Sequence, residues 1–274
     1  MKIADQLGNT LSLSGLPNRI ISIVPSQTEL LFELGLDEEV VGITKYCIHP
    51  KNWNETKTII GGTKKLNIEK IKELNPNLII GNKEENEKSQ IEELINYYPV
   101  WMSDIKTLED ALGMIDSIGK ITGKEKKALG IQNDIREQFS HFKLSSATIK
   151  VEKKRVAYFI WRKPYICAGA NTFINHMLSI CGLETVFSSL LPSPLGEGLG
   201  VRYPEVTSEE IQQANPSLIF LSSEPYPFQK KHIEEFQKVC PKAQIILVNG
   251  EMFSWYGSRL LYAPAYFQQL LLKL

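Results

Sequence analysis

The chain carries an internal repeat at a constant spacing of 140 residues. The positions identical in both copies are Glu69/Glu209, Ile71/Ile211, Asn75/Asn215, Pro76/Pro216, Leu78/Leu218 and Ile79/Ile219. In each copy a polar residue, Asn67 or Thr207, can cap a helix, and an Asn-Pro pair then ends that helix before an apolar strand. A chain that uses the same helix-strand unit twice, so far apart, is expected to form two lobes of related construction.

Strand and helix patterns alternate along most of the chain, which fits parallel strands joined by crossover helices. Between residues 107 and 146 the helical pattern is almost unbroken, and such a segment can join two lobes stiffly. We therefore predict the α/β class, with two α/β lobes that have mainly parallel central sheets and are joined by one long bridging helix. The expected ranges are 1–124 for the N-terminal lobe, 125–147 for the bridging helix and 148–274 for the C-terminal lobe.

The charge balance and the hydropathy exclude several classes of protein. Lysine and arginine number 31 and aspartate and glutamate 31, so the chain lacks the positive excess typical of nucleic-acid binding. No apolar run approaches the ~20 residues that cross a bilayer, so we expect no membrane-spanning segment. Asp5 and Gln6 interrupt any apolar run after Met1, so no export signal is expected in this chain. The four scattered cysteines favour buried thiols over a zinc site or a disulfide framework.

Motifs for catalysis are absent from the sequence. It contains no G-x-S-x-G, no H-E-x-x-H, no G-x-x-x-x-G-K-[ST] and no G-x-G-x-x-G after a strand, so we expect a protein that is not an enzyme and has no intrinsic cofactor. Among the four histidines, His49 alone lies in a loop after a predicted strand, where α/β proteins bind ligands. His49 can contact a metal, cobalt included, or it can simply stabilise a turn.

Aromatic and basic side chains recur at the predicted strand ends. Such side chains suit a flat, partly polar organic ligand held by stacking and a few charge-assisted hydrogen bonds, and the alternative is ordinary packing between the lobes. In the loop after the first strand, Ser26 is predicted to cap the next helix with Glu29 in capping-box position, and the free amides there suit a polar or anionic ligand. The candidate ligand-binding residues are Pro25, Ser26, Tyr46, His49, Trp161, Arg162, Arg202, Tyr203, Phe253, Trp255, Tyr256 and Arg259.

The repeat places one glutamate in the first turn of each repeated helix. The carboxylates of Glu69 and Glu209 can stabilise their helices through the helix dipole, by about 0.3 to 1 kcal/mol each. The functional interpretation requires a partner that offers two basic sites, one for each lobe.

Several motifs together resemble a known family, the substrate-binding proteins of ABC importers for cobalamin, haem and iron-siderophores. The resemblance covers nearly the whole chain and is strongest to the cobalamin-binding members. The motifs that carry it are Arg19–Leu31 (RIISIVPSQTELL), Val41–Tyr46 (VGITKY), Asn67–Ile71, Asn75–Ile80 and Tyr203–Glu209.

The resemblance implies two α/β lobes bridged by one long helix, matched here by Glu125 to Ser146, with the ligand in the cleft between the lobes. It implies a ligand that is a small metal chelate, either a cobalt corrinoid or an iron chelate. It further implies that Glu69 and Glu209 dock onto arginines of the importer's permease dimer. By this resemblance we expect a monomer in the periplasm or otherwise outside the cytoplasm.

Three functions remain open from the sequence. The first is capture of a cobalamin-like corrinoid and its delivery to an importer permease. The second is a receptor for an iron-siderophore or haem, which is favoured if Arg162, Arg202 and Arg259 converge on ligand carboxylates. The third is a cytoplasmic metal-chelate carrier or enzyme that reuses the fold, with His49 and Cys47 near the metal, and the lack of an export signal in the chain leaves it open.

Overall fold

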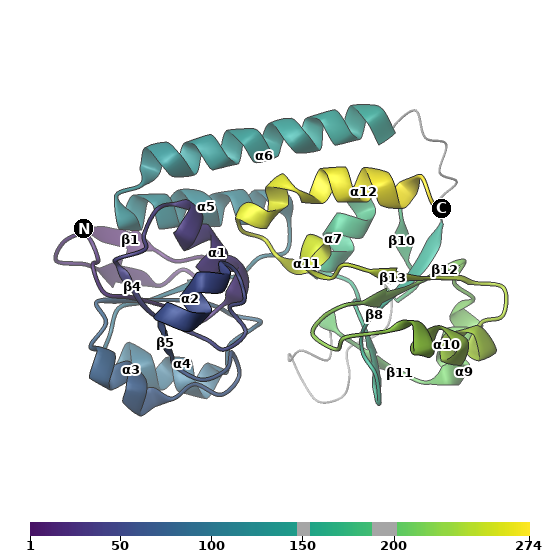
Figure 1. Ribbon diagram of the computed structural model, residues 1–274, viewed down its shortest axis with the longest axis horizontal. Coiled ribbons are helices and arrows are strands. Elements are labelled where there is room, and N and C mark those ends of the chain that lie inside the picture. The colour runs from purple at the N-terminus through teal and green to yellow at the C-terminus, as the bar shows by residue number, and fades with distance from the viewer. Residues whose placement is uncertain (147–153, 188–201) are drawn as a thin grey trace. The chain divides into compact units, whose positions relative to one another are not determined.

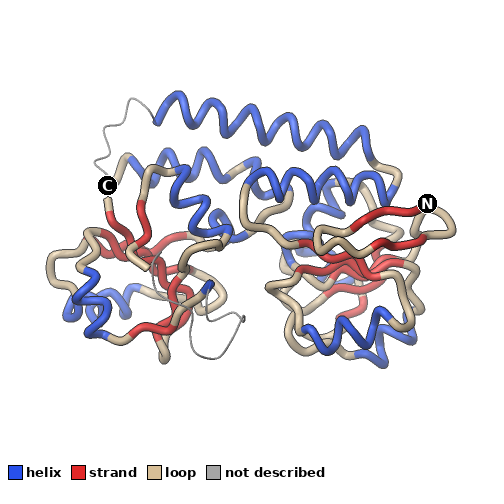
Figure 2. Tube along the Cα trace, turned by 180° about the vertical axis from the view of Figure 1, so that it is seen from behind, coloured by secondary structure: helices blue, strands red, loops and turns tan. Residues whose placement is uncertain are grey.

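The computed structural model describes residues 1–146, 154–187 and 202–274, and these form two compact units. The first unit contains residues 1–105, 109–137 and 256–261, and the second contains the other described residues. Each unit is a layered α/β structure around a sheet, as the ribbon and tube views show (Figures 1 and 2). The predicted α/β class with mainly parallel sheets is confirmed.

The first unit is built on a five-stranded parallel sheet. Helices cover both faces, with α3 (Ile68–Leu74) and α4 (Lys88–Ile95) on one face and α5 (Leu108–Thr122) on the other (Figure 1). Because both faces are covered, every residue of the two central strands β3 and β6 is buried. The strand order is β5 (Thr58–Ile59), β4 (Val40–Ile43), β3 (Ile20–Ser22), β6 (Leu78–Asn82) and β7 (Val100–Ser103).

Shorter elements complete the first unit. Helix α1 (Pro25–Glu33) follows β3, and α2 (Lys51–Thr56) follows β4. An antiparallel hairpin of β1 (Lys2–Ala4) and β2 (Thr10–Ser12) precedes the sheet along the chain. The 3-10 turn η2 (Ser258–Leu261) belongs to this unit although it lies near the end of the chain.

The second unit has a six-stranded sheet in which β8, β12 and β13 are parallel. Strand β10 (Glu184–Thr185) also runs parallel to β8, whereas β9 pairs with β8, and β11 with β9, in antiparallel fashion. The strand order is β11 (Glu205–Val206), β9 (Tyr165–Cys167), β8 (Arg155–Trp161), β12 (Leu218–Ser222) and β13 (Gln244–Val248). The helices on its two faces are α7 (Phe173–Ile180) and α12 (Ala263–Leu271) on one, and α9 (Ser208–Ala214) and α10 (Ile233–Val239) on the other (Figure 1).

The sequence repeat is also a structural repeat. Helices α3 and α9 both have 7 residues, and each begins after a capping side chain, Asn67 or Thr207, that accepts a hydrogen bond from the backbone N–H three residues on. Each helix ends at an asparagine in the left-handed conformation, with φ 41° at Asn75 and φ 44° at Asn215. The prediction of two units of related construction is confirmed at these elements.

The predicted long helix is present as α6, which spans Glu125–Ser146 without a break. Its residues up to 137 belong to the first unit and those from 138 to the second. Residue 147, where the helix was expected to end, lies outside the described residues. One face of α6 is apolar because its buried residues recur every three or four positions. These residues are Ala128, Ile131, Ile135, Phe139 and Phe142.

Candidate ligand-binding residues at the strand ends

In the first unit, the predicted ligand-binding residues follow the carboxyl ends of parallel strands. Pro25 and Ser26 come directly after β3, and Tyr46 and His49 come after β4. The crossover connections of a parallel sheet leave all its carboxyl ends at one edge, where α/β proteins bind ligands. The segment 256–261 belongs to the same unit and contributes Tyr256 and Arg259.

Ser26 lies inside the first turn of α1 and does not cap it. The helix begins at Pro25, a residue favoured at the first helical position because it has no N–H to leave unpaired. The cap residue is Val24, which makes no side-chain bond to the helix. The predicted capping box of Ser26 and Glu29 is therefore wrong. Ser26 is also 2% exposed, which leaves its side chain little surface for a ligand.

Tyr256 is fixed to the loop after β6. Its hydroxyl donates a hydrogen bond of 2.6 Å to Oε1 of Glu85, and the tyrosine is only 5% exposed. Burial and the neighbouring Glu85 carboxylate raise the pKa of Tyr256 well above its usual value. The phenol therefore stays protonated, and it acts as a hydrogen-bond donor that holds the segment 256–261.

Arg259 is neutralised within the same unit. Its Nε donates to Oε2 of Glu29 at 2.9 Å and its Nη2 donates to Oε1 of the same carboxylate. The two side chains are 13% and 12% exposed. A two-point ion pair of this kind, mostly withdrawn from water, leaves Arg259 poorly suited to bind a ligand carboxylate.

The close approach of residues 256–261 to α1 depends on Gly257. A Cβ atom added to Gly257 would lie 2.3 Å from the backbone oxygen of Ser26 and 3.3 Å from Cβ of Leu30. Because the first of these atoms is backbone, the clash cannot be relieved by turning a side chain. Glycine at this position therefore lets Tyr256 and Arg259 reach their glutamates.

Tyr46 is the most exposed of the predicted residues in the first unit, at 52%. Its ring lies under the ammonium group of Lys45, with Nζ at 5.1 Å from the ring centroid. His49 is half-buried in the same loop and precedes Pro50 through a cis peptide bond. The loop thus presents an open aromatic face close to a histidine in sequence.

In the second unit, Trp161 ends β8 and is 40% exposed. Its ring packs edge-on against Tyr226, with 5.7 Å between the ring centroids and 67° between the planes. Tyr226 follows β12, so the pair joins the carboxyl ends of two neighbouring parallel strands. This arrangement holds one edge of Trp161 while leaving much of its surface open.

Arg162 is bound to Glu235 of α10. Its Nε and Nη2 both donate to Oε2 of that carboxylate, at 2.9 and 2.7 Å, and the hydroxyl of Tyr165 donates to Oε1. Partial burial opposes ionisation of Glu235, yet these hydrogen bonds lower the pKa of its carboxyl. Burial and Glu235 raise the pKa of Tyr165 to about 12. At neutral pH the cluster is a compensated ion pair.

Phe253 is a core residue and not a surface one. It is fully buried, and its ring packs against Tyr158, Phe220 and Phe267 within the second unit. Its place in the core removes Phe253 from the set that can contact a ligand. Trp255 is 5% exposed, and its indole Nε1 donates to Oε1 of Glu224 at 2.9 Å.

Arg202 and Tyr203 are half-buried residues of the second unit, at the start of a described range. The backbone oxygen of Arg202 accepts a hydrogen bond of 2.8 Å from the N–H of Gly169. A side chain at Gly169 would meet that same oxygen at 3.0 Å, so the two segments lie in close backbone contact. The contact fixes the chain just before Tyr203.

The sequence-based prediction missed the carboxylates that organise these residues. Glu29, Glu85, Glu224 and Glu235 each accept hydrogen bonds from a predicted aromatic or arginine side chain. The partners are between 31 and 230 residues apart along the chain. A local motif cannot reveal contacts at such separations, and the one signal in the sequence is that Glu85 and Glu224 closely follow the ends of β6 and β12.

Glu69 and Glu209 occupy the same position in the repeat, the second residue of α3 and of α9. Both are exposed, the side chain of Glu69 by 78%. Their surroundings differ, because Nζ of Lys72 lies 3.0 Å from Oε1 of Glu69, whereas Gln212 stands at the corresponding position of α9. The two carboxylates are therefore equivalent in fold and different in charge environment.

The described residues hold no group of three or more His, Cys, Asp or Glu side chains arranged to bind a metal ion. The four cysteines are buried free thiols, as expected. Burial raises the pKa of Cys47, whose sulfur lies 3.0 Å from the hydroxyl of Thr28 and 3.2 Å from that of Thr44. A neutral, enclosed thiol of this kind is a poor metal ligand.

Comparison with known proteins identifies the family. Residues 20–242 match the family described as periplasmic binding protein. The chain belongs to this family. The resemblance to substrate-binding proteins that the sequence motifs indicated is therefore confirmed.

Individual members of the periplasmic binding protein family match over most of their length. The vitamin B12-binding protein of Pectobacterium carotovorum is 24% identical over 249 residues, which cover 90% of this chain and 86% of that protein. The periplasmic vitamin B12 binding protein of Vibrio cholerae has a structure similar to this one, with a TM-score of 0.78, 22% identity, and coverage of 94% and 97% of the two chains. A periplasmic heme binding protein from Pseudomonas aeruginosa is equally similar in fold, with a TM-score of 0.78 at 17% identity and 93% coverage of each chain.

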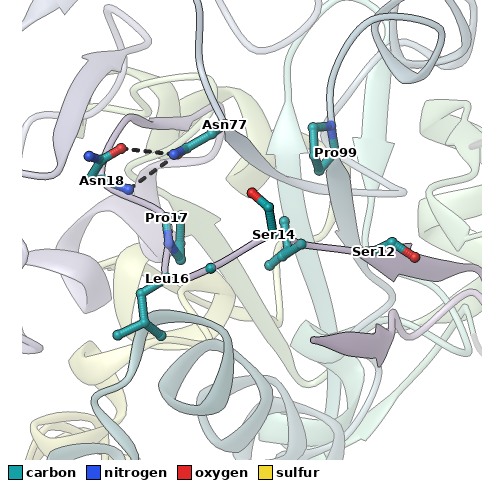
Figure 3. Close-up of a pocket in the computed structure, with 9 residues that line it drawn as sticks. Ser12, Ser14, Leu16, Pro17, Asn18, Asn77 and Pro99 are labelled. Carbon is teal, nitrogen blue, oxygen red and sulfur yellow. Dashed lines mark hydrogen bonds between the residues drawn. The ribbon is translucent and has the colours of Figure 1, made fainter.

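A pocket in the first unit lies away from the predicted ligand-binding residues Tyr46 and His49 of that unit. It has a volume of about 350 Å³ and sits at the amino ends of β3, β6 and β7, the opposite edge of the sheet from Tyr46 and His49 (Figure 3). The side chains of Asn18 and Asn77 hydrogen-bond to each other across it, with Nδ2 of Asn77 at 2.8 Å from Oδ1 of Asn18. None of its lining residues is ionisable. They are Ser12, Leu13, Ser14, Gly15, Leu16, Pro17, Asn18, Asn77 and Pro99.

Within the described ranges, no helix combines the length and the apolar character that crossing a membrane requires.

Proposed function

We propose that this chain is the substrate-binding protein of an ABC importer and that its ligand is a cobalamin-like corrinoid. The proposed ligand contacts are Tyr46, His49, Trp161 and Tyr203, with Pro25 in support. The binding is not enzymatic, and the metal belongs to the ligand. Membership of the periplasmic binding protein family supports the transport role, and the relatives named as vitamin B12-binding proteins support the ligand class.

The observation that favours one ligand class over the other is the pairing of the arginines with glutamates. Arg162 and Arg259 are each held by a glutamate of their own unit, through three and two hydrogen bonds respectively. Haem and many siderophores carry carboxylates or other anionic groups, which need uncompensated cations. The periphery of a corrinoid is rich in neutral amides, which need aromatic surface and hydrogen-bond donors. The compensated arginines beside exposed aromatics favour the corrinoid.

The other two functions receive less support. A haem or siderophore receptor was expected if Arg162, Arg202 and Arg259 converged on ligand carboxylates, and two of these three arginines are paired within the protein. A metal-chelate carrier or enzyme that uses Cys47 would need an accessible thiolate, and this thiol is fully buried. The relatives support a binding protein over an enzyme.

A ligand panel tests the proposed function. Isothermal titration with cyanocobalamin, hemin and a ferric siderophore should give the tightest binding for cyanocobalamin. Replacement of Tyr46 or Trp161 by alanine should weaken this binding by at least tenfold, or about 1.4 kcal/mol per residue. The control is Tyr97→Ala, which removes a 63% exposed aromatic ring of the first unit just before the amino end of β7, at the opposite edge of the sheet from Tyr46. Tightest binding of hemin, or unchanged binding in both variants, would contradict the proposal.

The partner in transport is the permease dimer of the importer, and we propose that Glu69 and Glu209 dock onto its arginines. Two exposed carboxylates at equivalent positions of a repeat suit a partner with two equivalent basic sites. We propose that the protein acts as a monomer outside the cytoplasm. The location is supported by similar proteins that are named as periplasmic.

A further inference from the structure

The ion pair of Arg162 and Glu235 lies beside the proposed ligand contact Trp161. Arg162 is the residue after Trp161, at the carboxyl end of β8. Both partners of the pair are partly accessible, with side chains that are each 25% exposed. The side chain of Arg162 also hydrogen-bonds to Tyr226, whose ring packs against Trp161, so a ligand that stacks on Trp161 would meet a guanidinium whose charge is already matched.

We propose that Glu235 sets the charge selectivity of the site by masking Arg162, so that neutral chelates bind and anionic chelates are disfavoured. This inference rests on the proposed function, since it deepens the choice of ligand at the same residues. An anionic ligand that recruited Arg162 would leave the Glu235 carboxylate without its strongest donor and would face that carboxylate's charge at short range. A neutral amide-bearing ligand meets neither penalty.

The surroundings of Glu235 keep the pair in place. Tyr165 donates to the carboxylate oxygen that Arg162 uses less, and its ring packs against Phe236 with 5.1 Å between the ring centroids. A carboxylate that accepts from two side chains at once is fixed in orientation, and the fork of Arg162 fits that orientation. The packing of α10 against β9 thus keeps Glu235 in position to pair with Arg162.

The chain offers a matched control in the pair of Arg136 and Glu109. Nη1 of Arg136 donates to both oxygens of Glu109, at 2.9 and 3.1 Å, and Nη2 donates to Oε2. This pair has a similar two-point geometry, but it joins α6 to α5 in the first unit, whereas Trp161 belongs to the second unit. Loss of the Glu109 carboxylate removes one partner of Arg136 and leaves the pair of Arg162 and Glu235 in the second unit intact.

The experiment compares Glu235→Gln, Glu109→Gln, Arg162→Gln and the double variant E235Q/R162Q for binding of hemin and of cyanocobalamin. Glu235→Gln should increase hemin affinity by roughly fivefold, since an exposed charge pair contributes up to about 1 kcal/mol, and this gain should shrink at high salt. The double variant should lose the gain, because it acts through Arg162. Glu109→Gln should leave the binding of both ligands within about twofold of the wild type, and Glu235→Gln should raise the affinity for hemin more than the affinity for cyanocobalamin.

An unchanged hemin affinity in E235Q, an equal gain in E109Q, or a gain that persists in the double variant would overturn the proposed mask. The gain in hemin binding can be measured whether or not the wild type binds cyanocobalamin. Failure of the proposed function, seen as a wild type that does not bind the corrinoid, is therefore distinguishable from failure of this inference. Circular dichroism melting of each variant checks that the fold is retained.

Discussion

Asn75 and Asn215 end the two repeated helices in the same left-handed conformation, with ψ 64° and 60°. An L residue with a Cβ is disfavoured there, and asparagine is tolerated because its short polar side chain can bond locally. The backbone N–H of each asparagine bonds to a carbonyl three residues earlier, Lys72 or Gln212. The shared geometry makes the two positions a matched pair for mutation.

Asn75→Ala and Asn215→Ala should each lower the free energy of unfolding by about 1 kcal/mol, while replacement by glycine should be neutral or slightly stabilising. Urea denaturation measures the effect. Asn96→Ala is the control, because Asn96 ends α4 in the right-handed helical conformation. A loss as large in N96A as in N75A would show that the asparagine side chain matters more than the backbone conformation.

Acid should destabilise the second unit through His232. Burial, together with the nearby cations Arg162 and Lys231, lowers the pKa of His232, and Glu235 only partly offsets this. Its Nδ1 accepts a hydrogen bond of 2.9 Å from the backbone N–H of Gln229. Protonation of Nδ1 would therefore break this hydrogen bond and place two N–H groups against each other. Because the folded pKa lies below the unfolded value of about 6.5, stability falls as the pH drops through 6.5, by at most about 1.4 kcal/mol per pH unit.

His232→Asn should remove this slope from denaturation curves recorded below neutral pH. His141→Asn serves as the control, since His141 is exposed on α6. If the slope survives in H232N, another group with a depressed pKa causes the acid sensitivity.

Gly257→Ala should lower the free energy of unfolding by about 1 to 3 kcal/mol, because the new Cβ would overlap the backbone oxygen of Ser26. The matched substitution is Gly130→Ala in α6, where a Cβ would meet nothing within 4 Å. That change should stabilise by up to about 1 kcal/mol through helix propensity alone. A tolerated G257A, measured by thermal and chemical unfolding, would mean that the segment 256–261 can move away from α1.

Charge reversal of Glu209 should weaken association with the permease more than reversal of Glu69. Lys72 already compensates the Glu69 carboxylate, whereas no ion pair to Glu209 is found among the described residues. Binding to the importer permease in nanodiscs at low salt should fall by roughly fivefold in E209K and by less in E69K, and the effect should fade at high salt.

Glu109→Lys is the control for net charge in that experiment, since Glu109 is exposed on α5. Equal losses in E69K and E209K would contradict compensation by Lys72. Binding unaffected by either reversal would contradict docking through these glutamates altogether, and unfolding of E69K or E209K would assign them to helix stability.

The repeat, the α/β class and helix α6 could be predicted from the sequence because they depend on local signals. Caps, Asn-Pro breaks and apolar periodicity each act within about one or two turns of chain. Ser26 was misplaced because Pro25 can itself take the first helical position. Phe253 was misassigned because an aromatic after a strand looks the same in sequence whether it faces the core or the surface.

The partners of the arginines could not be predicted, for a different reason. Arg259 and Glu29 are 230 residues apart, and Arg162 and Glu235 are 73 apart. The sequence contains 31 acidic residues, and most of them could satisfy either arginine equally well by charge. Only the three-dimensional arrangement selects among them, and the pairing it shows supports the corrinoid, the first of the three functions expected from the sequence, over an anionic chelate.

The inclusion of residues 256–261 in the first unit has a consequence for biosynthesis. Glu29 and Glu85 leave the ribosome long before Arg259 and Tyr256, which satisfy them and lie 230 and 171 residues further along the chain. The earlier part of the first unit must therefore wait with these acidic groups hydrated until residues 256–261 have been translated. A chain released before residue 256 would contain every strand of the first unit's sheet and would still lack residues 256–261, which belong to the same unit.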